Sequence, residues 1–230
     1  MKLYGIPMSP FVRKARVVLE LKGLDYDIVD IYPGTKTAEY LAISPLGKIP
    51  ALHDGDVVIC DSSVIIEYLE EQYPDTTVRP KSIEDRAKSR WLEEYGGSML
   101  FKPCADHIFM ERLTKPVMTN NPTDERIVEN SITNLVPPVF DYVESQLPAT
   151  GFFFGELGVA DIAVATAIIN ATYADFDVDA LRWPKLSAHL AQIMAHPVLM
   201  KCMQTEKPMI DSLKKMVGQQ MVVQQMVVQA

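Results

Sequence analysis

Cysteine and histidine are scarce in this chain of 230 residues, which contains three of the former and four of the latter. Cys60, Cys104 and Cys202 lie far apart and form no C-x-x-C pair, which argues against a disulfide scaffold and a dithiol redox centre. The histidines show no H-x-x-x-H spacing, so we expect no metal site. No apolar run approaches the length that crosses a bilayer, and residues 1–5 read as a strand rather than a secretory signal. We therefore expect a cytoplasmic protein without membrane contact.

Basic residues are also too few for nucleic-acid binding. The 22 Lys and Arg residues are outnumbered by 30 Asp and Glu residues, so the net charge is −8. Phosphates repel such a surface, and no basic cluster stands out to overcome the repulsion. What the chain does have is 48% hydrophobic and 23% charged residues, the profile of a soluble globular protein of one or two domains.

The first 76 residues predict a small α/β domain. Strands are expected at residues 1–5, 26–31, 48–52 and 57–59, helices at residues 11–22 and 62–73, and a short helix or an irregular segment at residues 37–43. Gly23 and Pro74 end the two longer helices, and Asp54-Gly55-Asp56 forms the turn of a hairpin. The order β-α-β-α-β-β-α within fewer than 80 residues indicates a mixed sheet.

The rest of the chain predicts an all-helical domain over residues 83–206, joined through a linker near residues 75–82. Its helices are expected at residues 83–107, 124–146, 159–173 and 184–206. Residues 207–230 are assigned to a C-terminal tail, in which Gln-Gln-Met-Val-Val occurs twice, at 219–223 and 224–228. This repeat is interpreted as a surface helix or a disordered end.

Ser9 and Pro10 stand at the start of the first predicted helix, where both residue types are ordinary choices. One interpretation is plain capping. In the other, the Ser9 hydroxyl lies at the positive end of the helix and donates a hydrogen bond to a bound thiolate. Lowering a thiol pKa by roughly two units needs about 3 kcal/mol, which one charge-assisted hydrogen bond and a helix terminus can supply. No His–Asp pair accompanies Ser9, so it is not expected to be a nucleophile.

Two further positions allow a ligand-binding interpretation. Pro50 begins a predicted strand although it cannot donate to a ladder, so the Ile49–Pro50 bond is expected to be either cis, turning Ile49 towards a ligand, or trans at a sheet edge. Asp61 and Ser62 begin the next helix. Either could simply cap it, or the terminus could hold a carboxylate while Asp61 binds an ammonium group, as an amino-acid head would require.

Together these motifs resemble the N-terminal domain of the glutathione transferases, most closely phi-class and related bacterial members. The resemblance rests on Met-Lys-Leu-Tyr-Gly-Ile-Pro-Met-Ser-Pro at 1–10, Glu-Tyr-Leu at 39–41, Ser-Pro-Leu-Gly-Lys-Ile-Pro-Ala-Leu at 44–52 and Asp-Ser at 61–62. It continues through Gly-Phe-Phe-Phe-Gly at 151–155, Val-Ala-Asp at 159–161, Arg-Trp-Pro at 182–184 and His-Pro at 196–197. It implies a thioredoxin-like domain with a four-stranded mixed sheet, an all-helical second domain, glutathione as cosubstrate, a hydrophobic electrophile and a homodimer.

The resemblance also implies residue roles. Ser9 matches the serine that hydrogen-bonds the glutathione sulfur, and the other matching positions are Lys36 for the glycyl carboxylate, Ile49 and cis-Pro50 for the cysteinyl part, and Asp61 and Ser62 for the γ-glutamyl head. Lys48 stands where many members have glutamine, and its cation could still reach a carboxylate. Helical position suggests a wall of the electrophile pocket formed by Met8, Phe11, Tyr95, Met99 and Ile108. Serine rather than cysteine at position 9 favours conjugation over thiol transfer.

Several alternatives stay open at this stage. Tyr4 is the other candidate for the sulfur contact, because some classes of the family use a tyrosine near the end of the first strand. Gly158 replaces the usual serine or threonine cap before Asp161, which is expected to cost a few tenths of a kcal/mol. Asp61 replaces the commoner glutamate. The competing functions are a non-catalytic stress or regulatory binding protein, and a glutathione-dependent isomerase, dehalogenase or peroxidase; the serine-rich isomerase motif is absent.

Overall fold

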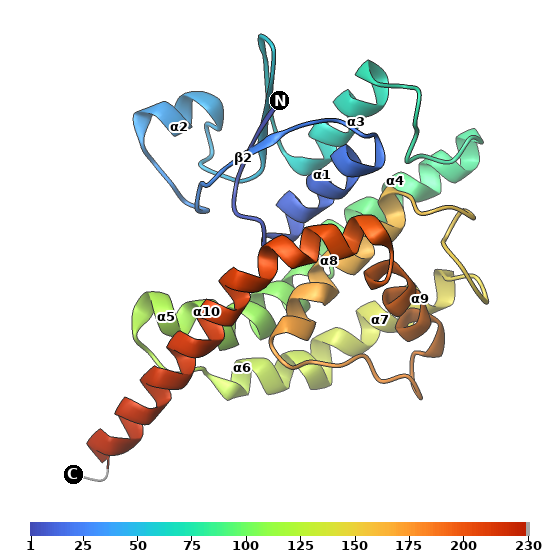
Figure 1. Cartoon of the computed structure of the whole chain (residues 1–230). Helices are drawn as coiled ribbons and strands as arrows, with labels where there is room; N and C mark the ends of the chain where they lie inside the picture. Colours follow the sequence, from blue (N-terminus) through green and yellow to red (C-terminus); the bar gives the residue numbers. More distant parts are fainter. Residues whose placement is uncertain (229–230) are drawn as a thin grey trace.

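The structure is a computed structural model that describes the backbone of residues 1–228 and the side chains of residues 1–220. Figure 1 shows two parts, a small sheet with its helices (blue to cyan) above a larger group of helices (green to red). This arrangement confirms the predicted thioredoxin-like fold followed by an all-helical region.

The N-terminal part is a four-stranded mixed sheet between helices. Its elements are β1 (Lys2–Tyr4), α1 (Pro10–Leu21), β2 (Asp27–Val29), α2 (Ala38–Ile43), β3 (Ala51–Asp54), β4 (Val57–Cys60) and α3 (Ser62–Gln72). The strand order is β2-β1-β3-β4, with β1 and β2 parallel and the other neighbours antiparallel. The α1 and α3 helices lie on one side of the sheet and α2 on the other (Figure 1). In the central pair of strands Leu3 lies opposite Leu52, and both are fully buried.

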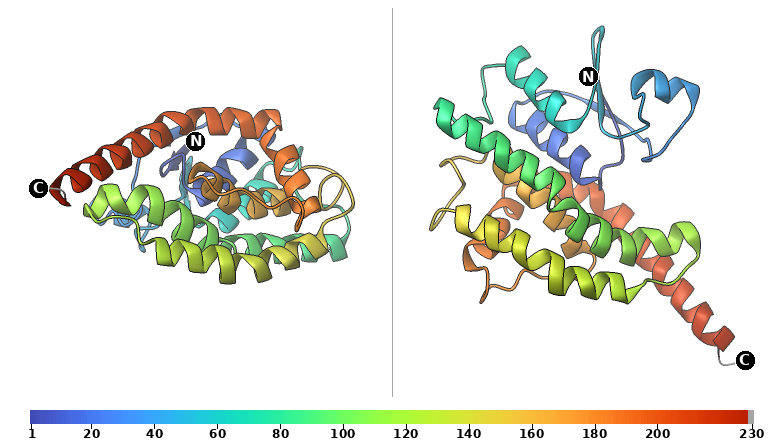
Figure 2. Two further views of the ribbon diagram at one scale, coloured as in Figure 1. Left: turned by 90° about the horizontal axis from the view of Figure 1, so that it is seen from below. Right: turned by 180° about the vertical axis from the view of Figure 1, so that it is seen from behind.

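The C-terminal part, from Ile83 to Val228, consists of helical segments joined by loops. Its elements are α4 (Ile83–Ser98), the π-helical segment η1 (Phe101–Thr114), α5 (Lys115–Thr119), α6 (Glu125–Asn130), the π-helical segment η2 (Ser131–Leu135), α7 (Val136–Gln146), α8 (Val159–Tyr173), α9 (Pro184–Met194) and α10 (Pro197–Val228). Seen from below, α10 and the α6–α7 run form opposite sides of this part (Figure 2). The α8 helix is the core of it, because thirteen consecutive residues from Val159 to Ala171 are buried. No helix within residues 1–228 is both long and apolar enough to span a bilayer.

The prediction of one regular helix over residues 83–107 is wrong. The α4 helix stops at Ser98, and the chain goes on as η1 to Thr114, with the Leu100 amide bonded to the Tyr95 carbonyl five residues earlier (3.4 Å). Pro103 has no N–H for an i→i−4 bond, and we attribute the change to wider helical pairing to this proline. The predicted helix at 124–146 contains a similar segment, η2, just before Pro137 and Pro138.

The predicted helix at residues 184–206 is divided in two. The α9 helix ends at Met194 and α10 begins at Pro197, because the residue before a proline is driven out of the helical region. The predicted boundary between residues 206 and 207 falls inside α10. The repeat at 219–228 belongs to the last turns of this helix, and its side chains from residue 221 onward lie outside the described residues.

A buried ion pair joins the two parts. Arg13 of α1 has no exposed surface and donates from Nε and Nη2 to the carboxylate of Glu206 in α10, with the shortest contact at 2.5 Å. Its Nη1 atom donates to the Thr166 carbonyl (2.8 Å) and to Asn170 Oδ1 (2.7 Å) in α8. Burial lowers and the Glu206 charge raises the pKa of Arg13, and the pKa stays above its ordinary value, so the guanidinium remains charged.

A steric constraint, which the sequence does not reveal, explains why residue 158 is a glycine. Gly158 caps α8, and its amide donates to Asp161 Oδ2 (2.9 Å). A Cβ atom on Gly158 would lie 2.9 Å from the carbonyl oxygen of Val78 in the linker, which itself accepts from the Val159 amide (3.0 Å). A glycine therefore lets the linker approach the start of α8.

We expect Gly158→Ser to destabilise the protein, although a serine is the better cap in isolation. The Cβ clash with a backbone carbonyl is expected to cost about 1–3 kcal/mol in urea unfolding, more than the few tenths gained by capping. Gly218→Ser is the control, because the space around this helical glycine is open and serine is the better helix former. A stabilising effect of Gly158→Ser would contradict the steric explanation.

We expect Glu206→Gln to lower the free energy of unfolding by about 3–5 kcal/mol, since it leaves the Arg13 charge buried without a counter-ion. The control is Asp211→Asn, one turn further along α10, where the pair with Lys207 is exposed on both sides. Urea unfolding of both variants should show a large effect for the first and little for the second. Equal effects would mean that burial of the Arg13–Glu206 pair is unimportant.

Candidate functional site

Ser9 lies at the N-terminus of α1, after the turn that leaves β1. Its amide donates to the Ile6 carbonyl (3.1 Å) and its carbonyl accepts from the Arg13 amide (2.8 Å). The hydroxyl, by contrast, makes no capping hydrogen bond to the helix. The backbone of Ser9 is thus fixed on both sides while its hydroxyl is not used for capping, so plain capping does not account for this serine.

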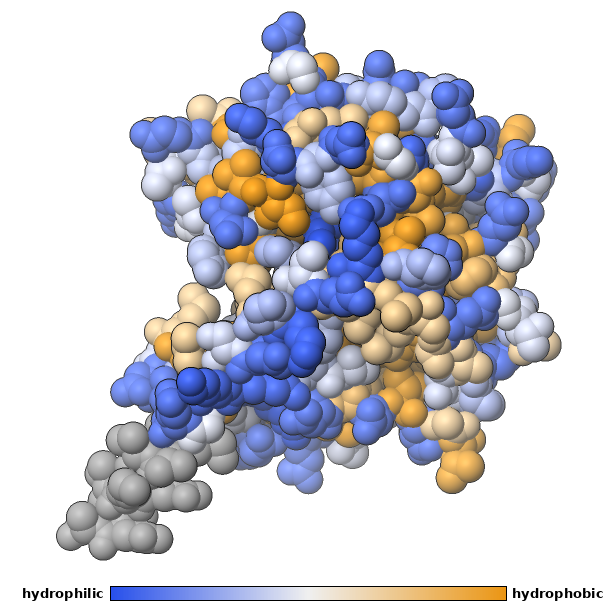
Figure 3. Space-filling model, viewed as in Figure 1, coloured by the Kyte–Doolittle hydropathy of each residue, from blue (hydrophilic) through white to orange (hydrophobic). Residues whose placement is uncertain are grey.

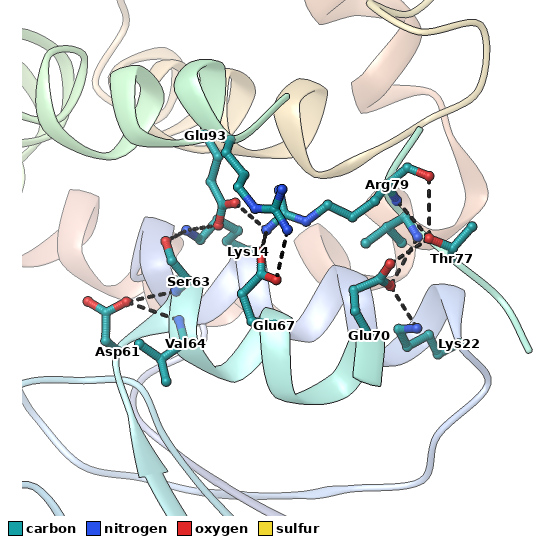
Figure 4. A network of polar contacts seen from close by, with 12 residues as sticks. Lys14, Lys22, Asp61, Ser63, Val64, Glu67, Glu70, Thr77, Arg79 and Glu93 are labelled. Carbon is teal, nitrogen blue, oxygen red and sulfur yellow. Dashed lines mark hydrogen bonds and ion pairs between the residues drawn. The ribbon is translucent and has the colours of Figure 1, made fainter. Parts of the chain in front are cut away.

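Asp61 lies at the start of α3 and does act as its cap. Its Oδ1 atom accepts from the amides of Ser63 (2.8 Å) and Val64 (3.4 Å), as Figure 4 shows. Asp61 is exposed and adopts φ 76° and ψ 131°, outside the left-handed helical region that aspartate tolerates, so its backbone is strained. Ser62 follows as the first helical residue and is 4% exposed. The capping interpretation therefore holds for Asp61, and its second carboxylate oxygen makes no hydrogen bond to the described residues.

The Ile49–Pro50 peptide bond is cis, as the resemblance implied. The Pro50 carbonyl accepts from the Asp61 amide (3.3 Å), which brings these two predicted site residues together. Ile49 is partly buried, and neither its N–H nor its C=O is hydrogen-bonded to another residue of the described chain. Free backbone groups next to β3 are the type of partner that an extended peptide uses when it pairs with a sheet.

Lys36 and Lys48 are exposed on two neighbouring segments. The Gly34 amide donates to the Gly47 carbonyl (3.0 Å), and a Cβ atom on Gly47 would lie 2.8 Å from the Thr35 carbonyl. Gly47 also has a φ of 61°, which favours glycine. Neither lysine forms an ion pair within the described residues, so both ammonium groups are available to an anionic ligand.

The backbone at Lys48 is held by two hydroxyl groups from the α2 segment. Tyr40 Oη (2.7 Å) and Ser44 Oγ (2.8 Å) both donate to the Lys48 carbonyl. Burial raises the pKa of Tyr40, so its hydroxyl remains a donor at neutral pH. Tyr4 packs its ring 6.2 Å from that of Tyr40, which places this alternative sulfur donor against α2.

The five residues suggested for the electrophile pocket separate into two groups. Phe11 stacks on Phe101 of η1 with ring centroids 5.0 Å apart, Met8 is 7% exposed in the turn before Ser9, and Met99 is 49% exposed. Tyr95 and Ile108 are buried in the core, and their place in a pocket wall stays a prediction. Tyr95 packs 4.5 Å from the Tyr142 ring of α7, and Ile108 has no exposed surface.

A buried charge network connects α1, α3, α4 and the linker, and sequence reasoning did not find it. Lys14 Nζ donates to Ser63 Oγ and to Glu93 Oε1, both at 2.9 Å, and Arg79 Nη2 donates to Glu93 Oε2 (2.7 Å) and to Glu67 (Figure 4). These contacts tie α1 and α3 to α4. Their residues are up to 79 positions apart, so local spacing contains no signal for them. Within residues 1–228 no group of three His, Cys, Asp or Glu side chains is arranged to hold a metal ion.

The chain matches two family models, the glutathione S-transferase N-terminal domain over residues 3–77 and the C-terminal domain over residues 128–192. A probable glutathione S-transferase, GSTF2 of Oryza sativa subsp. japonica, is 30% identical over 215 residues, which cover 90% of this chain and 98% of the relative. The chain belongs to the glutathione transferase family. Glutathione S-transferase 3 of Zea mays is 33% identical over 87% of this glutathione transferase and 92% of the relative.

Solved structures of the family agree with this fold. The crystal structure of a glutathione S-transferase from Rhodospirillum rubrum superposes with a TM-score of 0.78 at 28% identity, covering 87% of this chain and 90% of that chain. The resemblance identified from the motifs is thereby confirmed at the level of the family and its two-domain architecture. The roles of the individual site residues in this glutathione transferase stay predictions.

We expect Asp61→Asn to leave the stability of this glutathione transferase nearly unchanged, since asparagine caps a helix as well as aspartate and meets the same backbone strain. Asp61→Ala should cost about 1–2 kcal/mol in urea unfolding, because it removes the cap. If asparagine were as damaging as alanine, the negative charge rather than the cap would stabilise α3.

Proposed function

We propose that this protein conjugates glutathione to a hydrophobic electrophile, with the Ser9 hydroxyl donating a hydrogen bond to the glutathione thiolate. The observation that carries the proposal is the Ser9 hydroxyl, which α1 does not use for its own cap although the backbone on both sides is fixed. A thiolate at this point would also benefit from the positive end of α1. Ser9 stabilises the sulfur anion and takes no part as a nucleophile.

The remaining site residues fit the other parts of a glutathione molecule. The free N–H and C=O of Ile49, next to cis-Pro50, would pair with the cysteinyl backbone of the tripeptide. Lys36 and Lys48 would meet its glycyl carboxylate. At the start of α3 the γ-glutamyl head would place its carboxylate near the amide of Ser62. Its ammonium group would lie near the carboxylate oxygen of Asp61 that does not cap the helix.

The electrophile would bind in the hollow between the two parts of the molecule. Figure 3 shows the surface hollowed at its left edge, between the N-terminal part near α2 and the helical part near α5. Phe11 and Phe101 form an aromatic contact across the boundary of these parts, and Met99 adds exposed apolar surface beside η1, whereas Met8 is mostly buried. Such walls select a hydrophobic partner without a specific polar contact.

The family also supports a homodimer, a cytoplasmic location and a role in detoxification, which we propose together with the conjugating activity. Large apolar side chains on adjoining elements support the dimer: Val64 of α3 is 50% exposed and Trp91 of α4 is 53% exposed. Covering them with a second copy would remove apolar surface from water.

We expect the bound glutathione thiol to have a pKa well below its free value in the wild type, and Ser9→Ala to return it towards that value. The loss of about two units would lower the conjugation rate at mildly acidic pH on the order of 10- to 100-fold. Thiolate ultraviolet absorbance of the bound complex against pH measures the shift directly. Stability should hardly change, because the hydroxyl makes no capping bond.

Two variants serve as controls for this titration. Ser9→Thr keeps a hydroxyl and should retain most of the shift, and Tyr4→Phe should retain all of it, since Tyr4 packs against Tyr40. Binding with an unshifted pKa in the wild type, or no binding of glutathione, would overturn the proposed function and favour a non-catalytic binding protein. A shift that disappears only in Tyr4→Phe would transfer the role to Tyr4.

A further inference from the structure

The carbonyl of Met8, in the turn immediately before Ser9, is bound by a side chain from the other part of the molecule. Asn170 of α8 donates from Nδ2 to this carbonyl at 3.1 Å. The two residues are 162 positions apart, and Asn170 is 1% exposed. The contact therefore reaches from the centre of the helical part to the peptide unit that connects Met8 to Ser9.

The orientation of the Asn170 amide is determined by its two partners. On one side lies the Met8 carbonyl, which can only accept, and on the other the Arg13 guanidinium, which can only donate. The amide nitrogen must face the turn and the oxygen must face Arg13. A buried amide with both ends paired in this way has little freedom to rotate.

The second partner of Asn170 belongs to the same helix start. Arg13 lies in the first turn of α1, and its backbone amide donates to the Ser9 carbonyl. Its guanidinium is held in turn by Glu206 of α10 and donates to the oxygen of Asn170 at 2.7 Å. Asn170 thus contacts both the residue before Ser9 and the arginine that closes the first hydrogen bond after it.

We propose that Asn170 is a positioning residue of the thiol site, which from the helical part fixes the turn that directs the Ser9 hydroxyl. The inference rests on the proposed role of Ser9. Without the Nδ2 donor, the Met8–Ser9 peptide unit loses the partner of its carbonyl and is held only through the Ser9 amide, which donates to the Ile6 carbonyl. Displacing a catalytic group by about 1 Å can cost on the order of 100-fold in rate, so a small rotation is sufficient to matter.

The test uses neutral variants, so that no new charge near the sulfur shifts its pKa. Asn170→Leu has a similar volume and removes both hydrogen bonds, whereas Asn170→Ser is smaller and leaves room for water. Thr166→Val is the matched control, because Thr166 is 4% exposed on the same helix and its hydroxyl bonds only to the Ala163 carbonyl (3.3 Å). Its backbone carbonyl, which Arg13 uses, is unchanged.

Ultraviolet titration of bound glutathione and the pH profile of kcat/KM are measured on all three variants and on Ser9→Ala. We expect Asn170→Leu and Asn170→Ser to raise the pKa of the bound thiol by about one unit, moving the profile to higher pH and lowering kcat on the order of tenfold at mildly acidic pH. The KM for glutathione should change much less. Thr166→Val should behave as the wild type, even if its unfolding transition is shifted.

An unshifted thiol pKa in Asn170→Leu overturns the positioning role, and if that variant does not fold, an unshifted pKa in Asn170→Ser does so. A shift of equal size in Thr166→Val also overturns it, since the effect would then follow from general loosening of α8. The parent proposal fails separately, because its failure is a thiol pKa that Ser9→Ala leaves unchanged.

Discussion

The ion pair between Arg13 and Glu206 constrains the position of everything around α1. Both charges of this pair lack exposed surface, so each is stable only while the other stays in place. The α1 helix can therefore keep the Arg13 charge buried only when the N-terminal and helical parts are packed together. Lys14, the next residue, repeats the arrangement on another side of α1 by pairing with Glu93 of α4. The helix that begins with Ser9 is therefore oriented by the helical part on two sides.

The two helix starts at the site are used differently, and the difference is informative. Asp61 spends one carboxylate oxygen on capping α3, whereas Ser9 leaves α1 without a side-chain cap. An unused polar group at a helix terminus costs the fold a stabilising interaction of about 1 kcal/mol. A missing cap of this kind is expected where a side chain binds a ligand instead of stabilising its own helix.

Sequence reasoning found the local elements around the predicted site but not the distant residues that hold them in place. The strand-to-helix turn, the cis bond before Pro50 and the start of α3 are short-range patterns, and each was found where it was expected. Asn170 left one local signal, a polar amide within the otherwise apolar run of α8, yet nothing in that run shows which group it binds. For the same reason Tyr95 and Ile108 were assigned to a pocket wall, because helical spacing shows a face but not what covers it.

The sequence by itself determined the family and the order of strands and helices in the N-terminal part, because these follow from local patterns that do not depend on distant neighbours. Only the tertiary structure decided the need for glycine at position 158 and the link from Asn170 to the turn of Ser9. Each of these depends on atoms brought together from distant segments, where close packing and buried hydrogen bonds are specified by three-dimensional contact.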